Sequence, residues 1–310
     1  MTGANGFVGP HLIRQLLKNP ENEVVAGVSQ HAAALTVDGQ LIPTVSYDLR
    51  DEPSIRSMLT AVQHDQVYHL AGISKTYGVA VEDYVQINTL GAYYVGKAIL
   101  DAFGDHTKLL FVSSASVYGA TGQEGRPLKE TDPIKPTTDY GVSKASAELH
   151  VMALQAKGLN SVIVRPFNHT GPGQQLGFVC PDLVHRLKES IKQTPSGEVP
   201  VLQAGKLDSV RDFTDVRDVV EAYELIMNWF ETGQVVNVAS GTGVSVRQII
   251  DTLVHEIAKL PGVEIASLDE QMQRSNEDVI IGDADLVKSR IGWLPQYSLK
   301  TTLEDIWYNS

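Results

Sequence analysis

Residues 2–9 read Thr2-Gly3-Ala4-Asn5-Gly6-Phe7-Val8-Gly9 and run directly into an amphipathic helical pattern over 10–18. The three glycines stand at the spacing Gly-x-x-Gly-x-x-Gly. Glycines are often no more than turn residues, but at this spacing before a helix they let the backbone approach a pyrophosphate. The helix N-terminus adds oriented N–H groups and a positive dipole end. We therefore predict a dinucleotide site, with cofactor contacts from Gly3, Asn5, Gly6, Phe7, Val8 and Gly9.

Short apolar runs alternate with helical patterns along the chain. The runs at 23–28, 44–48, 66–71, 108–113, 161–165 and 234–239 are typical of buried strands. Amphipathic patterns occupy 10–18, 83–103, 140–157 and 216–229. This alternation indicates an α/β fold, in which a doubly wound parallel sheet of the Rossmann type is covered by helices on both faces.

The pattern changes after Arg165 to a loop-rich stretch. We predict a dinucleotide-binding domain formed by 1–166 and 212–240, and a smaller, discontinuous α/β substrate domain formed by 167–211 and 241–310. A glycine turn of this kind normally follows a buried strand of about five residues, whereas only Met1 precedes Thr2. We expect a truncated start, which would leave the two neighbours of the first strand with unpaired edges.

The 310 residues are 43% hydrophobic and 20% charged, as in ordinary globular proteins. A formal net charge of −12, with no basic run, argues against nucleic acid as a partner. The single cysteine, Cys180, excludes an intrachain disulfide, and we expect it to be packed in its apolar run. Because the sequence shows neither a signal-peptide pattern nor about 18 consecutive apolar residues, we expect a soluble, cytoplasmic protein without a membrane partner.

Tyr140 and Lys144 stand one helical turn apart and therefore share a helix face. A nearby ammonium favours the phenolate, so we expect the pKa of Tyr140 to fall below its usual value of about 10. Such a phenol is a candidate proton donor to a carbonyl. Most Tyr-x-x-x-Lys pairs are surface helix residues, but here the pair follows both Ser113-Ser114 and the glycine-spaced start.

Further cofactor contacts are predicted where two of the strands end. Asp48 closes the run 44–48 and could accept a hydrogen bond from an adenine amino group, although an exposed strand-end aspartate is the simpler interpretation. Leu49 follows it, and Leu70 and Ala71 end the run where the cofactor ribose is expected. His69 has no second histidine or carboxylate at metal-binding spacing, so we predict a structural histidine and no metal site.

The choice between NAD and NADP is made where the second strand ends, at Gly27-Val28-Ser29-Gln30-His31. An acidic residue there would bind the ribose 2′-hydroxyl of NAD and repel a 2′-phosphate. This stretch has none, and it also lacks the arginine that would indicate NADP. Because Ser29 could donate to a phosphate, we favour NADP over NAD.

Ser114 and Tyr140-x-x-x-Lys144, behind a Thr-Gly-x-x-Gly-x-x-Gly start, resemble the extended short-chain dehydrogenase/reductase family and its nucleotide-sugar branch. Asn88, in Gln86-Ile-Asn88-Thr89-Leu-Gly91, and the run 113–119 are further landmarks of that branch. The resemblance covers nearly the whole chain and implies a nucleotide-diphosphate sugar as substrate, with Asn88 in the cofactor site. It also implies that Tyr140 exchanges the hydroxyl proton, Lys144 holds the nicotinamide ribose and Ser114 hydrogen-bonds the reacting oxygen.

The second half of the chain resembles the GDP-4-keto-6-deoxy-D-mannose reductase group of this branch, with GDP-mannose 4,6-dehydratases as relatives. The resemblance lies in 165–174, 177–179 and 210–218. It implies that Asn168 contacts the sugar or its diphosphate and that Arg211 clamps the diphosphate, unless Arg211 pairs with Asp212 or Asp215 instead. The implied substrate-binding residues are Ser114, Ser116, Asn168, Val179, Arg211, Arg274 and Glu277, the last two near the guanosine unless they belong to a solvated loop.

Ser116 bears on the reaction. Dehydratases of the family place a glutamate two residues after the catalytic Ser or Thr, because removing the C5 proton requires a carboxylate base. A serine hydroxyl cannot readily take up that proton, so Ser116 argues against a GDP-mannose 4,6-dehydratase-like enzyme. We expect NAD(P)H-dependent reduction of a GDP-linked 4-keto-6-deoxyhexose, with a nucleotide-sugar 4-epimerase as the alternative. A dinucleotide-binding regulatory module is the non-enzymatic alternative, although such a module would be expected to lose part of the Ser/Tyr/Lys set.

The helical patterns 83–103 and 140–157 correspond to the pair that forms a four-helix dimer interface in the family. Tyr93, Tyr94 and Ala98 are apolar enough for an interface, but packing against the sheet explains them equally well. We predict a homodimer or a higher homo-oligomer.

Overall fold

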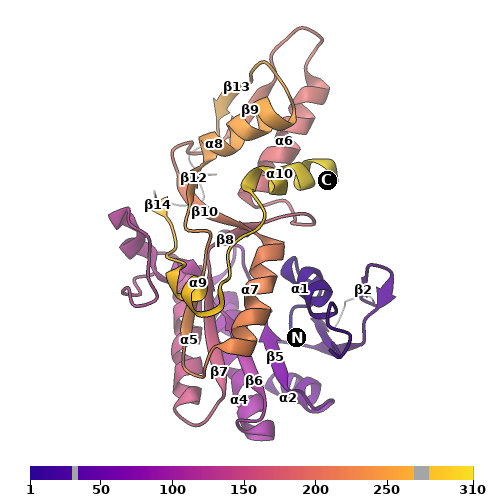
Figure 1. Cartoon of the computed structure of the whole chain (residues 1–310), viewed down its shortest axis with the longest axis vertical. Coiled ribbons are helices and arrows are strands. Elements are labelled where there is room, and N and C mark those ends of the chain that lie inside the picture. Colours follow the sequence, from indigo (N-terminus) through magenta and orange to yellow (C-terminus); the bar gives the residue numbers. More distant parts are fainter. Residues whose placement is uncertain (30–33, 269–278, 310) are drawn as a thin grey trace.

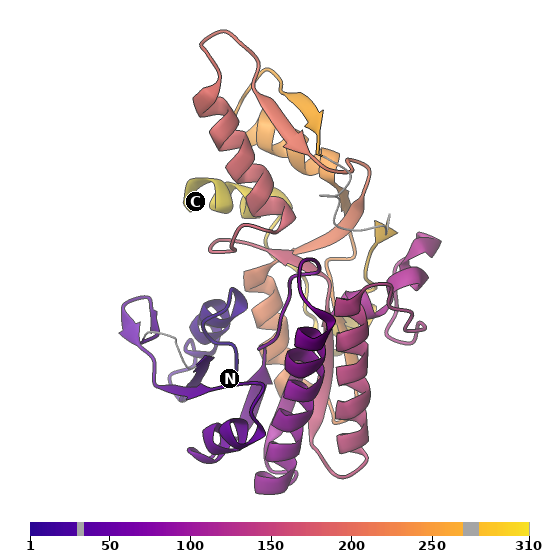
Figure 2. The ribbon, with the colours of Figure 1, turned by 180° about the vertical axis from the view of Figure 1, so that it is seen from behind.

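The computed structural model describes residues 1–29, 34–268 and 279–309. Two parts are visible in Figure 1, and the view from behind in Figure 2 shows the same division. One part is a parallel sheet flanked by helices. The other, which contains α6, α8, α10 and β9, lies at one end of the molecule.

The sheet is doubly wound, as predicted. Its order is β11-β7-β6-β5 on one side and β1-β4 on the other, and all neighbours are parallel. Its strands are β1 (Ala26–Ser29), β4 (Thr44–Tyr47), β5 (Gln66–His69), β6 (Lys108–Val112), β7 (Ser161–Pro166) and β11 (Val235–Val238). They coincide, within a few residues, with the runs predicted from the sequence.

Thr2 joins the two halves of the sheet. It forms parallel bridges with Gly27 of β1 and with His69 of β5. Its backbone N–H donates to the Tyr68 carbonyl at 2.9 Å, and the Gly27 N–H donates to the Met1 carbonyl at 2.6 Å. The connection between β1 and β5 therefore runs through Met1 and Thr2. A small cavity of about 10 Å³ lies beside it, lined by Met1, Thr2, Val25, Gly27, Val45, Met58, Leu59, His64 and Val67.

Helices cover both faces of the sheet (Figure 1). The helices α1 (Val8–Leu16), α7 (Val216–Trp229) and α9 (Asp285–Ile291) lie on one face, and α2 (Glu52–Thr60), α4 (Gly91–Phe103) and α5 (Asp139–Gln155) lie on the other. Leu110 of β6 is packed into the first core, whereas its neighbours Leu109 and Phe111 are packed into the second. Successive strand residues point to opposite faces, so the stretch 109–112 is apolar throughout because both faces are buried.

The pattern predicted as a single helix over 83–103 has an irregular middle. It consists of α3 (Val81–Tyr84), a π-helical turn η1 (Val85–Leu90) and α4. π-Helical turns inside α-helices are rare and are frequently found at functional sites. This one carries Asn88, and its place in the site is described below.

The second part has its own core between α6 and the C-terminal helices. Its elements are α6 (Val179–Gln193), β9 (Val201–Ala204), α8 (Val246–Asp251), the π-helical turn η4 (Thr252–Ile257), β13 (Glu264–Ser267) and α10 (Leu299–Asn309). A small sheet joins β10 (Val210–Asp215) to β8 (Asn168–Thr170), β12 (Gly243–Ser245) and β14 (Val279–Ile280). The remaining elements are the hairpin β2 (Thr36–Val37) and β3 (Gln40–Leu41), and the 3-10 turns η2 (Ala115–Val117) and η3 (Gly119–Glu124).

One stretch departs from the predicted domain division. Residues 241–310 were predicted to lie wholly in the substrate domain, but α9 packs against α7 and β11 of the nucleotide-binding part. Val287 and Trp293 are buried in the same core as Tyr223. The chain therefore returns to the first part before it forms α10. The short helix gave no periodicity strong enough to reveal this contact in the sequence.

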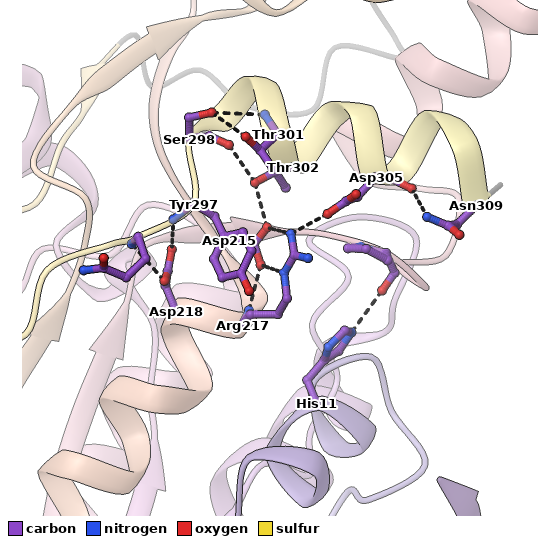
Figure 3. A network of polar contacts seen from close by, with 12 residues as sticks. His11, Asp215, Arg217, Asp218, Tyr297, Ser298, Thr301, Thr302, Asp305 and Asn309 are labelled. Carbon is purple, nitrogen blue, oxygen red and sulfur yellow. Dashed lines mark hydrogen bonds and ion pairs between the residues drawn. The ribbon is translucent and has the colours of Figure 1, made fainter. Parts of the chain in front are cut away.

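A polar network fixes α10 to the start of α7 (Figure 3). Asp215 caps α7 and accepts hydrogen bonds from the Arg217 backbone N–H (2.8 Å), from Arg217 Nε (2.8 Å) and Nη2 (2.7 Å), and from Thr302 Oγ1 (2.7 Å). The Arg217 guanidinium also pairs with Asp305 at 2.7 Å and lies 3.7 Å from the centre of the Tyr297 ring. One buried carboxylate thus links α10 to α7 and contributes to the joint between the two parts of the molecule.

Within 1–29, 34–268 and 279–309, no helix is both long and apolar enough to cross a bilayer.

Candidate active site

The glycine turn lies where the sequence placed it, at the N-terminus of α1. Gly3 has a φ of +70°, and a Cβ there would lie 2.7 Å from the backbone nitrogen of Ala71. A Cβ at Gly9 would lie 2.2 Å from the Ala4 carbonyl oxygen, so this position also excludes a side chain. Gly6 is exposed, and the space around it is more open than at Gly3 and Gly9. The nearest atom to a Cβ added at Gly6 would be the Gly3 carbonyl oxygen, at 3.3 Å.

The start of α1 keeps its N–H groups available. Its N-cap residue, Phe7, makes no side-chain capping hydrogen bond. A helix N-terminus without a side-chain cap presents N–H donors and a positive dipole end to an anion. The open space at Gly6 and these donors together fit the pyrophosphate of a dinucleotide.

Two aromatic contacts hold the turn in place, and sequence reasoning missed both. The Tyr47 hydroxyl at the end of β4 accepts a hydrogen bond from the Gly3 N–H at 3.0 Å. The Phe7 ring stacks on His169, with 6.2 Å between ring centres. His11 of α1 is hydrogen-bonded to the Pro172 carbonyl at 3.0 Å, as Figure 3 also shows. The loop after β8 therefore packs directly onto the predicted pyrophosphate turn.

Tyr140 and Ser114 meet at the carboxyl end of the sheet. Tyr140 is in the first turn of α5 and is only 9% exposed, and Ser114 follows β6. The Ser114 hydroxyl lies close enough to the Tyr140 phenol to act on its pKa. Ser114 Oγ also accepts the Ser116 backbone N–H at 3.1 Å, which fixes the serine rotamer. The structure thus brings together the two hydroxyls that the sequence analysis proposed to address one reacting oxygen.

The predicted fall in the pKa of Tyr140 is wrong for this state of the protein. Burial raises the pKa of the phenol, and this effect exceeds the opposing effect of the nearby Ser114 hydroxyl. The sequence argument failed because it counted the charge of Lys144 and not the loss of water around the phenol. Tyr140 is consequently protonated throughout the neutral range, as a proton donor must be.

Lys144 is buried with Tyr140 but is directed towards the strand beneath it. Its Nζ donates to the Val112 carbonyl at 2.7 Å and lies 5.2 Å from the centre of the Phe111 ring. Burial lowers the pKa of the ammonium to about 8. A Cβ on Gly72 would lie 3.7 Å from Nζ, so the ammonium borders the loop after β5 where the ribose was predicted.

We expect cofactor use to fail above about pH 8, because the free enzyme then loses the Lys144 charge. Tyr140 stays protonated over the same interval, since its own pKa is raised. The measurement is kcat/KM for the reduced cofactor as a function of pH at constant ionic strength, which reports ionisations of the free enzyme. A value of kcat/KM that still rises between pH 8 and pH 10 would contradict the assignment.

Asn88 braces the loop after β5 and is 2% exposed. Its Oδ1 accepts the Ile73 N–H at 2.8 Å, and its Nδ2 donates to the Ile73 carbonyl at 3.1 Å and to Ser143 Oγ at 3.0 Å. Both amide hydrogens are therefore used within the protein. Any contact of Asn88 with the predicted cofactor would have to come from its oxygen, so its evident role is to hold 70–73 in place.

The other predicted cofactor residues line the same edge of the sheet. Ser29 is the exposed last residue of β1, and Asp48 follows β4 and accepts the Arg50 N–H at 2.9 Å. Leu70 and Ala71 are half-buried against Gly3. Leu49 packs against Gly91 at the start of α4, and Gln30 and His31 lie outside the described residues.

His69 and Cys180 are structural, as expected. His69 is buried and is hydrogen-bonded through Nδ1 to Thr2 Oγ1 at 2.7 Å, and burial lowers its pKa to about 3. Burial raises the pKa of the Cys180 thiol to about 12, so it is not a nucleophile near neutrality. The described parts of the chain contain no group of three or more His, Cys, Asp or Glu side chains arranged to hold a metal ion.

The predicted substrate residues that the structure describes lie on four different elements. Ser116 is half-buried in η2, Asn168 is the exposed first residue of β8, and Val179 begins α6. Arg211 is half-buried in β10 and donates from Nη1 to the Val210 carbonyl at 2.8 Å. Arg274 and Glu277 lie outside the described residues.

The carboxylates that could have paired with Arg211 are engaged by other groups. Asp212 accepts the backbone N–H groups of Ser240 (2.8 Å), Gly241 (2.9 Å) and Gly282 (3.1 Å). Asp215 is engaged by Arg217 and Thr302 as described above. The clamping role of Arg211 therefore stays a prediction. Asp212 holds the backbone of 240–241 and Gly282, and Asp215 holds Arg217 and Thr302.

The chain matches a known family model along almost its whole length. Residues 1–306 match the model described as GDP-mannose 4,6 dehydratase. The chain belongs to the GDP-mannose 4,6 dehydratase family. Membership of this family confirms the predicted nucleotide-sugar branch and an NAD(P)-dependent enzyme acting on a nucleotide sugar.

Individual members and solved structures agree with this placement. The GDP-6-deoxy-D-mannose reductase of Pseudomonas aeruginosa is 33% identical, over 99% of this chain and 94% of that protein. The structure of RMD from Pseudomonas aeruginosa complexed with NADPH has a TM-score of 0.80 and 29% identity, covering 99% of this chain and 96% of that one. The Thermus thermophilus UDP-glucose 4-epimerase in complex with NAD also has a TM-score of 0.80, with 25% identity over 99% and 97% of the two chains.

Proposed function

We propose that the chain reduces, with NADPH or NADH, the 4-keto group of a GDP-linked 4-keto-6-deoxyhexose, the chemistry of GDP-rhamnose-type synthesis. The proposal is carried by the buried Tyr140 phenol, which lies beside Ser114, has a raised pKa and fits a proton donor to a carbonyl oxygen. The identity of 33% with the Pseudomonas aeruginosa GDP-6-deoxy-D-mannose reductase supports the choice of substrate class.

In the proposed reaction, Tyr140 gives its proton to the sugar O4 as the carbonyl becomes an alcohol. A reduced nicotinamide bound at this site supplies the hydride that C4 receives. Ser114 donates a hydrogen bond to the same oxygen, where negative charge develops. The Lys144 ammonium has three N–H donors and gives one of them to the Val112 carbonyl. We propose that the other two are directed to the cofactor ribose.

The glycine turn and α1 are proposed to hold the cofactor diphosphate, through Gly3, Gly6 and Gly9 and the uncapped N–H groups that follow. We propose NADP as the preferred cofactor, because Ser29 stands exposed at the end of β1 and no acidic residue occurs in 27–31. For the sugar nucleotide, we propose contacts from Ser116, Asn168, Val179, Arg211, Arg274 and Glu277.

Ser116 continues to argue against a dehydratase reaction, because a hydroxyl is a poor base for the C5 proton. A nucleotide-sugar 4-epimerase is the second candidate, supported by the similarity to the Thermus thermophilus UDP-glucose 4-epimerase. Such a reaction needs the same Ser114, Tyr140 and Lys144 but no net consumption of reduced cofactor.

The deciding experiment is incubation with GDP-4-keto-6-deoxymannose and either NADPH or NADH, followed by absorbance at the reduced nicotinamide band. Consumption of the cofactor supports the reductase, and the ratio of the two rates tests the preference for NADP. Interconversion of two sugar epimers without cofactor consumption would favour the epimerase. Cofactor binding without either reaction would favour a regulatory module.

We also propose a dimer formed through α4 and α5, which pack side by side. Exposed apolar residues occur on this surface at Val85 (42%), Val142 (52%) and Leu149 (64%). Light scattering at micromolar concentration is expected to give about twice the mass of one 33.7 kDa chain. We expect Leu149→Glu to shift this mass towards that of a monomer, and a wild-type mass of one chain would count against the dimer.

A further inference from the structure

A buried carboxylate lies one helical turn beyond the predicted Tyr/Lys pair. Glu148 follows Lys144 by four residues on α5, so Tyr140, Lys144 and Glu148 share one face of the helix. The Glu148 side chain is 0% exposed. Its Oε1 accepts hydrogen bonds from Ser113 Oγ at 2.5 Å and from Arg165 Nε at 2.9 Å, and its Oε2 accepts Arg165 Nη2 at 2.7 Å.

The partner arginine is held just as firmly on β7. Arg165 is 2% exposed and donates from Nη1 to the Tyr118 hydroxyl at 3.0 Å and to the Glu130 carbonyl at 3.1 Å. Its guanidinium lies 4.9 Å from the centre of the Tyr118 ring. The Tyr118 hydroxyl in turn donates to Asn237 Oδ1 at 2.7 Å. The carboxylate therefore has one fixed position between β7 and α5.

A contribution to the stability of the fold does not by itself explain why a buried Glu148–Arg165 ion pair is present. Removing two charges from water costs several kcal/mol per ion, and well-packed apolar residues of similar volume are often equally stable. The location of this pair is more informative. It touches Ser113, the neighbour of Ser114 in the chain, and its carboxylate stands one helical turn from Lys144, whose ammonium feels its charge.

Among the residues that the structure describes, the Lys144 ammonium contacts the Val112 carbonyl and the face of the Phe111 ring. Burial lowers the pKa of Lys144, and the charge of Glu148 acts in the opposite direction. The titratable or charged groups that face Lys144 or its neighbours are Tyr140 and Glu148 on α5, His69 on β5, Arg165 on β7, and Tyr84, which contacts the Tyr140 ring.

We propose that Glu148 is a positioning residue, whose buried carboxylate, fixed by Arg165 and Ser113, keeps the Lys144 ammonium charged and oriented beneath the cofactor site. This inference rests on the proposed function, because Lys144 matters only if a nicotinamide ribose binds beside it. It extends the Ser114, Tyr140 and Lys144 set by a fourth side chain that never touches the substrate. A merely structural pair would hold α5 on β7 without affecting the ionisation of Lys144.

Two variants separate these roles. Glu148→Gln removes the negative charge and keeps the shape and an oxygen for Arg165. Arg165→Met breaks the same ion pair but leaves the carboxylate, so it is the matched control. The Lys144 titration is followed by NMR of [6-13C]lysine-labelled full-length protein, with its signal assigned by Lys144→Arg.

The two variants are expected to move the Lys144 titration differently. In Glu148→Gln it should shift to lower pH than in the wild type, whereas in Arg165→Met it should stay in place or shift to higher pH. The alkaline limb of kcat/KM for the cofactor should move in the same way. Equal downward shifts in both variants, or no shift in Glu148→Gln, would overturn the proposal.

The role of Glu148 can still be tested if a single variant does not fold or if the protein has no reductase activity. If either single variant does not fold, the double variant Glu148→Gln/Arg165→Met replaces it, because it leaves no unpaired buried charge. A lowered Lys144 titration in the double variant supports the proposal, and an unchanged one overturns it. If the wild type lacks reductase activity while the NMR titrations still diverge, the proposed function fails and the electrostatic link between Glu148 and Lys144 stands.

Discussion

Tyr140→Phe is expected to lower turnover by about 10²- to 10⁴-fold, the usual contribution of a positioned general acid. The substitution removes the transferable proton and keeps the ring against Tyr84. Loss of one hydroxyl beside Ser114 should cost at most about 1 kcal/mol of stability, so the variant should fold. The measurement is kcat for the 4-keto sugar, together with the Kd of the reduced cofactor, which should change little.

Tyr84→Phe is the matched control for this prediction. It removes a hydroxyl from the neighbouring ring, 6.2 Å away, whose hydrogen bond goes to the Lys75 carbonyl at 2.6 Å. We expect turnover close to that of the wild type. If Tyr140→Phe keeps wild-type kcat, or if both variants lose turnover equally, Tyr140 is not the proton donor.

Asp215→Ala is expected to destabilise the protein by about 3 kcal/mol. Its carboxylate is 0% exposed, caps α7 and binds both Arg217 and Thr302. Breaking a buried ion pair costs about 3–5 kcal/mol, and losing an N-cap costs about 1 kcal/mol. The Arg217 side chain is 29% exposed and can regain water, which places the expected loss at the lower end of that range. Urea unfolding of the full chain measures the change.

Asp305→Ala tests the same network at its solvent edge (Figure 3). Asp305 pairs with Arg217 at 2.7 Å, but its side chain is 35% exposed. Exposed pairs contribute about 0–1 kcal/mol, so we expect a much smaller loss of stability than for Asp215→Ala. Equal losses in the two variants would show that burial of Asp215 is not what makes the joint between α7 and α10 strong.

Most of the nucleotide-binding part could be predicted from local patterns. Buried parallel strands produce continuous apolar runs, and the glycine turn before α1 has a fixed spacing. The six strands of the main sheet therefore appeared in the sequence close to their observed bounds. By contrast, α9 is short and packs on α7 through Val287, a contact that depends on the path of the chain and not on any periodicity.

The site shows the same division between local and long-range information. The sequence by itself determined that Tyr140 and Lys144 share a helix face and that the Gly3 turn precedes a helix, because both features follow from backbone periodicity. Only the tertiary structure decided that burial raises the pKa of the Tyr140 phenol and that Glu148, one helical turn beyond Lys144, pairs with Arg165. Desolvation and ion pairing depend on which distant segments exclude water from a side chain, and no local spacing encodes that.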